Sequence, residues 1–547
     1  MALGLYIAAS LGLFGIPVLG HIGTSYIGWD SNDPKFMIWC MSWWPHAVTH
    51  LTNPFHAPQM WAPSGANLAW DTSVPGLSLL AWPITASSGP VVSYNVLGLL
   101  APALASWTAY LLCFELTEAP WPSFAGGLVF GFSPYEVGQL MNAMNLFFVA
   151  LPPLAVLVVV RHAQARIRSF RFVLLLSLVL FGQFLISLEV FATMTLLGSI
   201  AMAVAFVATR EFRRQLARTA GLICIAYGIV AIAASPYLYF VAWGPAPAFL
   251  TKPPNAARGS VDLLNFVTPT KLTWLGNGVA QSVSSRFTGF LHENGAYVGI
   301  PLLLIVVWFA IEQRRSVAGK VVPSVLLAAA LLALGPRLKV LGKASVVMPW
   351  RLAQGIPLIG RAIPARLTLF GFLAAAVALA LWLARRPSRN YRWVLAVVAL
   401  AAIFPNIGVA TSTTALHSPA FFTSSLHDQV LYPQEMVLVI GHGRGAPLVW
   451  QALAGMSFRM PNGHGISEPL NFRNGYLASL FISLARPPTI SRATLVRFLE
   501  SHEVGAIVWD AGDPPESWSL LFSSLGMIPV PLGGVLFYQV PADIAPS

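Results

Sequence analysis

Apolar residues in this chain gather in long runs with almost no charged residues. Val91–Phe114, Thr219–Trp243 and Leu367–Ala384 contain none at all. A helix needs roughly 20 consecutive apolar residues to cross a bilayer. The pattern therefore predicts an α-helical polytopic membrane protein with about eleven transmembrane helices. The expected spans are 2–20, 92–116, 121–138, 143–160, 172–188, 190–208, 219–242, 295–312, 321–336, 367–384 and 393–409.

Basic residues are concentrated in short loops between these spans, at 161–171, 210–218, 314–320 and 385–392. Short loops rich in Lys and Arg face the cytoplasm, and the predicted spans put all of these loops on one side. The net charge of +12 therefore reflects orientation in a membrane and gives no sign of nucleic-acid binding. The opposite side, predicted to be outside, carries the loops 21–91, 243–294 and 337–366 and the tail 410–547.

The tail differs in character from the rest of the chain. Its strand-like and helix-like pieces alternate in the order EMVLVI, TLVRFLESHEV, GAIVWD, ESWSLLFSSLG and GGVLFYQV. This order predicts a C-terminal extracytoplasmic α/β domain over 410–547, after a transmembrane module over 1–409. The apolar stretch Val74–Ser87 is too short to span, so we expect a helix at the interface or a re-entrant piece.

The first outside loop carries Asp30, Asp33 and Asp71 among several Trp residues. Trp is common at the membrane–water boundary, and an Asp-Pro pair often starts a helix, so an aromatic belt with a helix cap at Asp33 is one interpretation. Glycosyl transfer needs a carboxylate to take the proton of the acceptor hydroxyl, and this boundary is where a lipid-linked substrate presents its head group. The two interpretations are compatible. Other candidate substrate contacts are Trp43, Trp44, His56 and Asp71 in this loop, and Glu189 later in the chain.

Glu189 lies between two apolar runs joined by almost no turn. An ionisable residue at membrane depth is costly and usually has a partner, which we expect to be Arg351, Arg361 or Arg366. The alternative is a turn residue that faces water. These three arginines are also candidates to neutralise a phosphate leaving group, although contact with lipid head groups would explain them equally.

Other polar segments give weaker signals. His292 and Glu293, in the predicted outside loop 243–294, are further candidate substrate contacts. The segment GHGRG (Gly441–Gly445) is most simply a turn, because it lacks the G-x-G-x-x-G spacing. His442 and His464 show no metal-ligand spacing and are interpreted as ordinary loop histidines. The three scattered cysteines exclude a zinc ribbon and a disulfide framework.

The order of these features resembles the type-C glycosyltransferases. The matching segments are GWDSNDPKFMIW, SLEVF, ENGAYVGIPLLL and RLAQGIPLIGRAIPARLTLF, within residues 1–409. The resemblance implies a GT-C-like fold, a polyprenyl-phosphate sugar donor, and an acidic base in the first outside loop. On this ground the base is Asp33, with Asp30 as the close alternative, because D-S-N-D stands where some members have an adjacent acidic pair.

We therefore expect an inverting glycosyltransferase (hexosyl- or pentosyl-) of the bacterial plasma membrane, acting on a lipid or glycan hydroxyl. No cation is required if arginines neutralise the phosphate, although outside carboxylates could hold a divalent cation. A flippase for lipid-linked glycans would instead need charged residues along a path through the membrane. A non-catalytic scaffold that binds envelope glycans is the third hypothesis, and it should tolerate Asp33→Asn.

Overall fold

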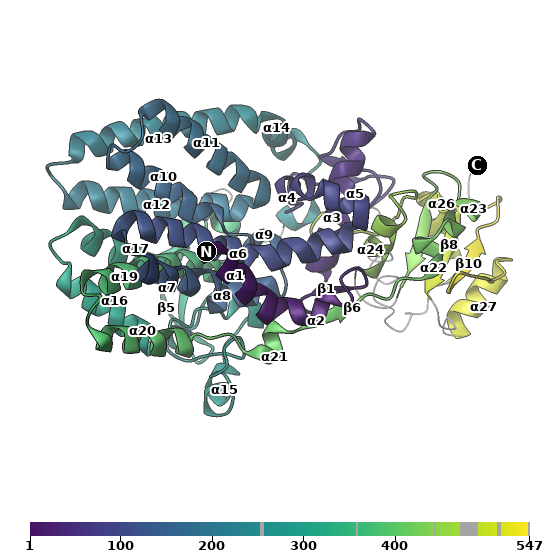
Figure 1. Cartoon of the computed structure of the whole chain (residues 1–547). Helices are drawn as coiled ribbons and strands as arrows, with labels where there is room; N and C mark the ends of the chain where they lie inside the picture. Colours follow the sequence, from purple (N-terminus) through teal and green to yellow (C-terminus); the bar gives the residue numbers. More distant parts are fainter. Residues whose placement is uncertain (252–255, 357–358, 442–444, 471–490, 511–515, 545–547) are drawn as a thin grey trace.

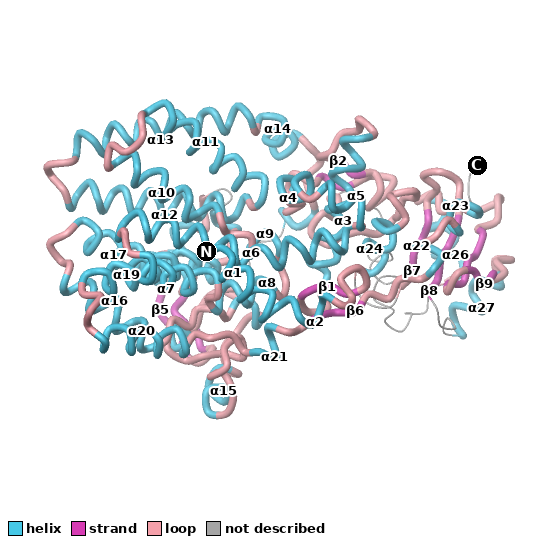
Figure 2. Tube along the Cα trace, viewed as in Figure 1, coloured by secondary structure: helices cyan, strands magenta, loops and turns pink. Residues whose placement is uncertain are grey.

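Helices form most of the molecule, and a small mixed domain lies at one end (Figure 1). The computed structural model describes residues 1–251, 256–356, 359–441, 445–470, 491–510 and 516–544. Figure 2 shows that nearly all strands lie in the C-terminal part or in loops at the edge of the helical part. The predicted polytopic helical class with a C-terminal α/β region is confirmed.

Seven helical segments in the described residues are long and apolar enough to cross a membrane. Three shorter apolar helices accompany them: α16 (Ile300–Glu312), α17 (Val317–Ala333) and α20 (Asn390–Ala402). The seven are Ala2–Leu19 (α1 Ala2–Ser10, the π turn Leu11–Gly15 and α2 Ile16–Leu19), α6 (Pro90–Thr117), Met144–Ala163 (α9 Met144–Phe147 and α10 Leu151–Ala163), α11 (Ser169–Ile186), α12 (Leu188–Ala208), α13 (Arg213–Ala233) and Pro364–Arg385 (the 3₁₀ turn Pro364–Leu367 and α19 Thr368–Arg385).

The prediction of one continuous helix over 121–138 is wrong. It forms two helices, α7 (Pro120–Gly131) and α8 (Pro134–Leu140). Ser133 causes the break, because its hydroxyl accepts a hydrogen bond from the Glu136 amide (3.2 Å) and Pro134 follows at the first helical position. A serine cap followed by proline starts a new helix rather than continuing an old one.

The predicted span 219–242 also differs from the structure. Helix α13 begins earlier, at Arg213, and ends at Ala233, and α14 (Ser235–Trp243) follows it. Pro236 stands in the first turn of α14, where its missing N–H costs nothing. Hydropathy alone merges the two helices because both are apolar.

Glycines let α7 pack closely on its neighbours. A side chain at Gly126 would meet the Ala376 carbonyl oxygen and the Cys113 sulfur, each at 2.9 Å. A side chain at Gly127 would meet the Tyr6 hydroxyl and the Ser106 carbonyl oxygen. Apolar burial contributes little to helix association in a membrane, and small residues at the contact allow the helices to pack closely.

Gly127→Ala is expected to lower the thermal stability of the purified protein. The added methyl overlaps backbone atoms of α6 that cannot move aside, and overpacking of this kind costs about 1–3 kcal/mol. The matched control is Gly198→Ala in α12, where an added methyl meets nothing within 4 Å and alanine favours the helix. Thermal unfolding in detergent checks this, and equal melting temperatures for the two variants would contradict the packing.

The C-terminal domain contains a four-stranded sheet in the order β7-β8-β10-β9. Strands β7 and β8 are parallel, and β10 is antiparallel to both β8 and β9. The strand and helix order predicted for the tail is confirmed. The elements are α22 (Ala420–Thr423), α23 (Leu426–Val430), β7 (Val437–Ile440), α24 (Ala446–Leu453), α26 (Arg492–Ser501), β8 (Ala506–Asp510), α27 (Glu516–Ser524), β9 (Val530–Leu532) and β10 (Val535–Gln539).

The first outside loop and the tail form one packed unit. Strand β1 (Ser25–Ile27) pairs antiparallel with β6 (Thr413–Ala415). In α3 (Asn32–Thr49), the Trp39 indole N–H donates to the side-chain oxygen of Gln451 in α24 (2.7 Å), and Trp39 is fully buried. Residues at the two ends of the chain thus meet at one surface, and the boundary proposed at 409/410 stays a prediction.

The remaining elements are short and lie in the loops predicted to be outside or in linkers. They are β2 (His56–Ala57), β3 (Ala66–Asn67), α4 (Pro75–Leu80), α5 (Trp82–Ser88), α15 (Val279–Ser284), β4 (Arg337–Val340), β5 (Lys343–Val347), α18 (Trp350–Ala353), α21 (Ile407–Ala410) and the 3₁₀ turns Ala248–Thr251, Leu263–Phe266, Leu291–Glu293 and Ile359–Arg361. The stretch Val74–Ser87 accordingly forms two short helices, α4 and α5, rather than one.

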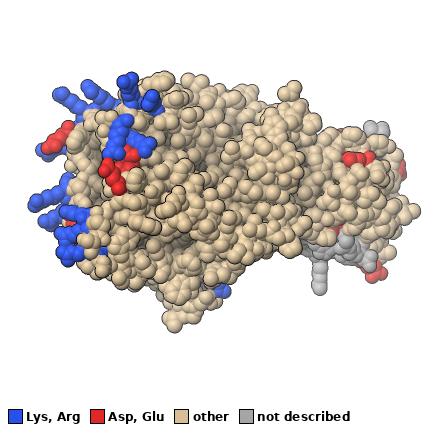
Figure 3. Space-filling view, viewed as in Figure 1, with Lys and Arg blue, Asp and Glu red and all other residues tan. Residues whose placement is uncertain are grey.

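Charged residues gather at the end of the helical part that lies farthest from the C-terminal domain (Figure 3). There Glu115 pairs with Arg161 and Arg166, each at 2.7 Å, and Arg392 pairs with Glu312 at 2.5 Å. The predicted basic loops thus share one end of the bundle.

Candidate functional site

Asp33 lies in the first turn of α3, at the end of the bundle that faces the C-terminal domain. The residue before the helix is Ser31, and its side chain makes no cap hydrogen bond. The interpretation of Asp33 as a helix cap is therefore wrong. Its carboxylate instead accepts a hydrogen bond from the Asn142 side-chain amide at 2.9 Å, and Asn142 in turn accepts one from the Ser31 hydroxyl at 2.8 Å.

His464 of the tail lies between two carboxylates of the first loop. Its Nε2 is 3.5 Å from Asp33 Oδ1, and its Nδ1 is 3.3 Å from Asp71 Oδ2. The imidazole is 6% exposed and stacks on the Phe36 ring with 4.3 Å between centroids. The interpretation of His464 as an ordinary loop histidine is wrong, because it contacts the leading candidate base.

This arrangement sets the charge of each group. Burial opposes a charge on His464, but Asp71 and Asp33 outweigh it and raise the His464 pKa to about 10. Burial would raise the pKa of Asp33, but the hydrogen bond and charge of His464, together with Asn142, lower it below its usual value. At neutral pH the cluster therefore holds an imidazolium between two carboxylates. The Asp33 side chain is 43% exposed, so one side remains open to a substrate.

Asp30 differs from Asp33 in its surroundings. Its carboxylate is 63% exposed and forms an ion pair with the buried Lys35 at 2.6 Å. Lys35 needs a counter-charge because it is only 6% exposed. Asp30 therefore has a structural role as the partner of Lys35, and Asp33 is the better candidate for proton transfer.

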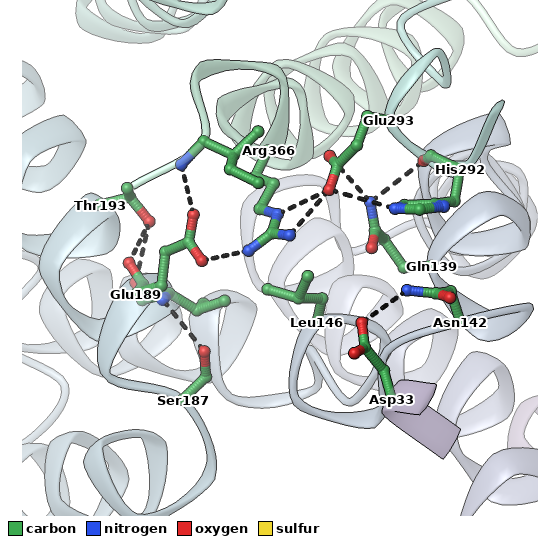
Figure 4. A network of polar contacts seen from close by, with 12 residues as sticks. Asp33, Gln139, Asn142, Leu146, Ser187, Glu189, Thr193, His292, Glu293 and Arg366 are labelled. Carbon is green, nitrogen blue, oxygen red and sulfur yellow. Dashed lines mark hydrogen bonds and ion pairs between the residues drawn. The ribbon is translucent and has the colours of Figure 1, made fainter. Parts of the chain in front are cut away.

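A second polar cluster joins Glu189, Glu293 and Arg366 (Figure 4). Arg366 donates to Glu293 Oε1 through Nε at 3.0 Å and Nη2 at 2.8 Å, and it also pairs with Glu189. The other oxygen of Glu189 accepts from the Ile363 amide at 2.7 Å. The structure confirms that Glu189 is paired with one of the expected arginines, and the alternative of a turn residue facing water is wrong.

This second cluster is poorly suited to hold a phosphate at Arg366. Three donors of its guanidinium are already bound to carboxylates. These donors would have to leave Glu189 and Glu293 before they could bind a phosphate. Phosphate binding by Arg366 stays a prediction, and its contacts with Glu189 and Glu293 tie down the start of α19.

Two amides from α8 and the turn after it reach the two clusters. Gln139 donates to the His292 carbonyl at 3.1 Å and to Glu293 at 3.4 Å, and Asn142 binds Asp33. Figure 4 shows both amides between the Glu293 side and the Asp33 side of the site. Sequence reasoning missed Gln139 and Asn142, although polar residues between two apolar runs were the available signal.

His292 lies on the side of the site next to Glu293. Its Nε2 is 3.6 Å from Glu293, and burial keeps the pKa of His292 below its usual value, so the ring is neutral at pH 7. The ring stacks on Phe290 at 5.4 Å, and the Arg258 guanidinium lies over Phe290 at 4.5 Å. Arg258 is therefore a cation near this cluster.

The other predicted site residues take different positions. Trp43 and Trp44 are buried, and their indole N–H groups donate to the carbonyls of Pro54 and Ser73, each at 3.0 Å. Both side chains contribute to packing, and their role as substrate contacts stays a prediction. His56 lies in the β2–β3 hairpin.

The two remaining arginines are placed in loops near the second cluster. Arg361 donates to the Leu250 carbonyl at 2.8 Å, and Arg351 is exposed on α18. Both stay candidates for anion binding. Of the GHGRG segment, His442 lies outside the described residues.

Within the described part of the chain, no group of three or more His, Cys, Asp or Glu side chains is arranged to hold a metal ion. At Asp33, the side facing His464 already contacts a positively charged ring. The chemistry proposed below uses no resident cation.

No protein-family model and no curated protein sequence matches this chain. Solved structures do match it. The archaeal oligosaccharyltransferase AglB from Archaeoglobus fulgidus, solved with an inhibitory peptide and a dolichol-phosphate, superposes with a TM-score of 0.55 and 13% identity, over 93% of this chain and 69% of AglB. The arabinofuranosyltransferase AftD from mycobacteria gives a TM-score of 0.61 and 16% identity, over 99% of this chain but only 40% of AftD.

Proposed function

The chain has the fold of the type-C (GT-C) glycosyltransferases, and we propose that it is an integral membrane glycosyltransferase. It moves a sugar from a polyprenyl-phosphate carrier to a hydroxyl of a lipid or glycan acceptor. The observation that carries the proposal is Asp33, an ionised and partly exposed carboxylate held by Asn142 and His464. Both matched enzymes transfer sugars, and AglB was solved with a dolichol-phosphate.

The position of the site supports chemistry at the outer surface of a membrane. Helix α12 has Glu189 in its first turn, and the carbonyl of Ala208 at its other end accepts a hydrogen bond from Lys320 at 3.3 Å. Helix α19 likewise begins beside Arg366 and ends at Arg385 among the basic loops. Since basic loops face the cytoplasm, the site and the C-terminal domain lie on the extracytoplasmic side, which for a bacterial protein is outside the plasma membrane.

In the proposed reaction, Asp33 removes the proton of the acceptor hydroxyl. The hydroxyl oxygen then attacks the anomeric carbon of the donor, and the bond from that carbon to the phosphate oxygen breaks. The polyprenyl phosphate leaves with the bonding electrons, and the proton stays on Asp33 until water removes it. Attack from the face opposite the leaving group inverts the configuration at the anomeric carbon.

The developing phosphate charge needs a cation to stabilise it. Arg361, Arg351 and Arg258 are the candidates. Arg361 and Arg351 are exposed residues that precede α19, and Arg258 lies over the Phe290 ring that stacks on His292. The neutral ring of His292 can donate a hydrogen bond to the same oxygen without adding charge. Arg366 is left to hold Glu189 and Glu293 in place.

A transporter is less well supported than an enzyme. Charged residues in the seven candidate spans lie within a few positions of either end, as with Glu115 in α6 and Glu189 in α12. A path for a charged head group through the membrane would need polar residues near the middle of the helices. The chemistry is instead gathered at one end.

The proposal is tested with purified protein in nanodiscs, radiolabelled polyprenyl-phosphate sugars and a lipid extract as acceptor. Label is expected to move from the carrier to a new lipid or glycan in the presence of wild-type protein. A donor panel of mannose, glucose, arabinose and galactosamine covers hexosyl and pentosyl transfer. If folded protein transfers label from none of these donors, the result would count against the proposal and favour a non-catalytic scaffold that binds envelope glycans.

A further inference from the structure

His464 belongs to the tail, yet its imidazole enters the first-loop cluster. The segment around it is tied to the first loop by backbone hydrogen bonds: the Met460 amide donates to the Gln59 carbonyl at 2.8 Å, and the Ala62 amide donates to the Met460 carbonyl at 3.0 Å. The Trp61 indole N–H donates to the His464 carbonyl at 2.9 Å. The position of the ring is therefore fixed by contacts on both sides of the residue.

The ring also has an orientation that suits two acceptors at once. Its two nitrogens face Asp33 and Asp71 at 3.5 and 3.3 Å, and stacking on Phe36 holds its plane. Only an imidazolium can donate from both nitrogens. Asp71 is 3% exposed and needs this positive charge, and it accepts from the Thr72 amide at 3.0 Å.

The contacts of Asp33 divide between its two oxygens. Oδ1 faces His464 and Oδ2 accepts from Asn142, so the rotation of the carboxylate is fixed from both sides. A base acts efficiently only when its oxygen is held in the geometry of attack. Asn142 supplies a neutral contact, whereas His464 supplies a contact and a charge.

We propose that His464 is a positioning residue of the reaction, which the tail inserts to orient Asp33 and keep it ionised, with Asp71 as the counter-charge of its ring. The active site is then incomplete without the C-terminal domain. This inference rests on the proposed function for its catalytic meaning. The ion cluster itself can be tested without any activity.

The kinetic test is the pH dependence of kcat/KM for His464→Gln. Glutamine retains a donor for Asp33 but not the charge, so burial then dominates and the pKa of Asp33 rises. Because Asp33 works as an anion, activity is lost as the pH falls through its pKa. The acidic limb should move to higher pH by about one unit or more, which means an additional loss, relative to pH 8, that approaches about tenfold at pH values below both limbs.

Two variants serve as controls for a purely structural effect. Asp71→Asn removes the counter-charge of His464 and should move the acidic limb in the same direction, while the site retains its volume. His417→Gln changes an exposed histidine of the tail, which pairs with Asp510 at 2.9 Å, and should leave the profile unchanged. A uniform loss at every pH in His464→Gln, with no shift of the limb, would overturn the proposal.

The second measurement is the imidazole nitrogen spectrum of the full protein labelled in its 11 histidines, with His464 assigned from the His464→Gln variant. Its ring should remain protonated at pH 8 in the wild type and should become neutral near pH 8 in Asp71→Asn. A neutral ring at pH 7 in the wild type would refute the ion cluster even if sugar transfer is observed. If the His464 ring is protonated but no sugar transfer is observed, the ion cluster stands and the proposed function is contradicted.

Discussion

Asp33→Asn is expected to reduce sugar transfer by about 10²–10⁴-fold, the range typical for loss of a general base. The amide has nearly the same size as the carboxylate, so the site keeps its volume, although the single amide oxygen can accept from only one of Asn142 and His464. It cannot accept the proton of the acceptor hydroxyl. The loss should appear in kcat and leave the KM for the donor within a few fold, because Asp33 acts mainly in the transition state.

Asp30→Asn is the matched control for this prediction. It lies three positions away on the same loop, but its carboxylate pairs with Lys35. Its replacement should lower the stability, because Lys35 loses its counter-charge, and should change transfer by much less than Asp33→Asn. The measurement is the initial rate of label transfer, with thermal unfolding of each variant alongside. Equal losses in the two variants, or the larger loss in Asp30→Asn, would contradict the assignment of the base.

Arg366→Ala is expected to destabilise the protein by about 3–5 kcal/mol, the cost of leaving buried carboxylates without their partner. Glu189 and Glu293 would remain with uncompensated charge, and Glu293 is only 3% exposed. The variant should therefore express poorly or unfold at a markedly lower temperature. Arg351→Ala, which removes an exposed arginine of the same region, should leave the melting temperature nearly unchanged.

A neutral replacement of the whole cluster separates stability from catalysis. Arg366→Met combined with Glu189→Gln and Glu293→Gln should recover much of the stability lost in Arg366→Ala, because no charge is left unpaired. If Arg366 instead served to bind the donor phosphate, Arg366→Ala would fold normally and lose affinity for the donor. That outcome would reverse the structural role assigned here.

Much of the helical architecture could be predicted because it depends on local composition. Runs of apolar residues and basic loops identify spans and their common end without any knowledge of tertiary contacts. The order of strands and helices in the tail was likewise predictable, since pieces such as Ala506–Asp510 are apolar and bounded by turn residues. Breaks within apolar runs were harder, as the Ser133-Pro134 start of α8 shows.

The site was only partly predictable, because its parts meet across long separations. Glu189 was recognisable as a charge between apolar runs, and the chemistry of that position predicted a partner among three arginines, of which the structure selects Arg366. His464 gave no local signal, since 393 positions separate it from Asp71. Asn142 is 109 positions from Asp33.

The tryptophans of the first loop show a further limit of composition. A cluster of Trp next to a membrane span is typical of an aromatic belt, but Trp39, Trp43 and Trp44 are buried in the protein. Trp39 packs against the tail through Gln451. A boundary between two parts of a protein has the same mixture of apolar surface and hydrogen-bonding needs as a membrane boundary, so the sequence alone does not distinguish them.

The most direct test of the central claim follows both parts of a doubly labelled polyprenyl-phosphate sugar in sealed proteoliposomes, with an acceptor lipid extract present. The enzyme proposed here should separate the labels: sugar appears on the acceptor with inverted anomeric configuration, and one polyprenyl phosphate is released for each sugar transferred. Transport of the intact, still linked donor across the bilayer, without any separation of the labels, would contradict the account and identify a flippase.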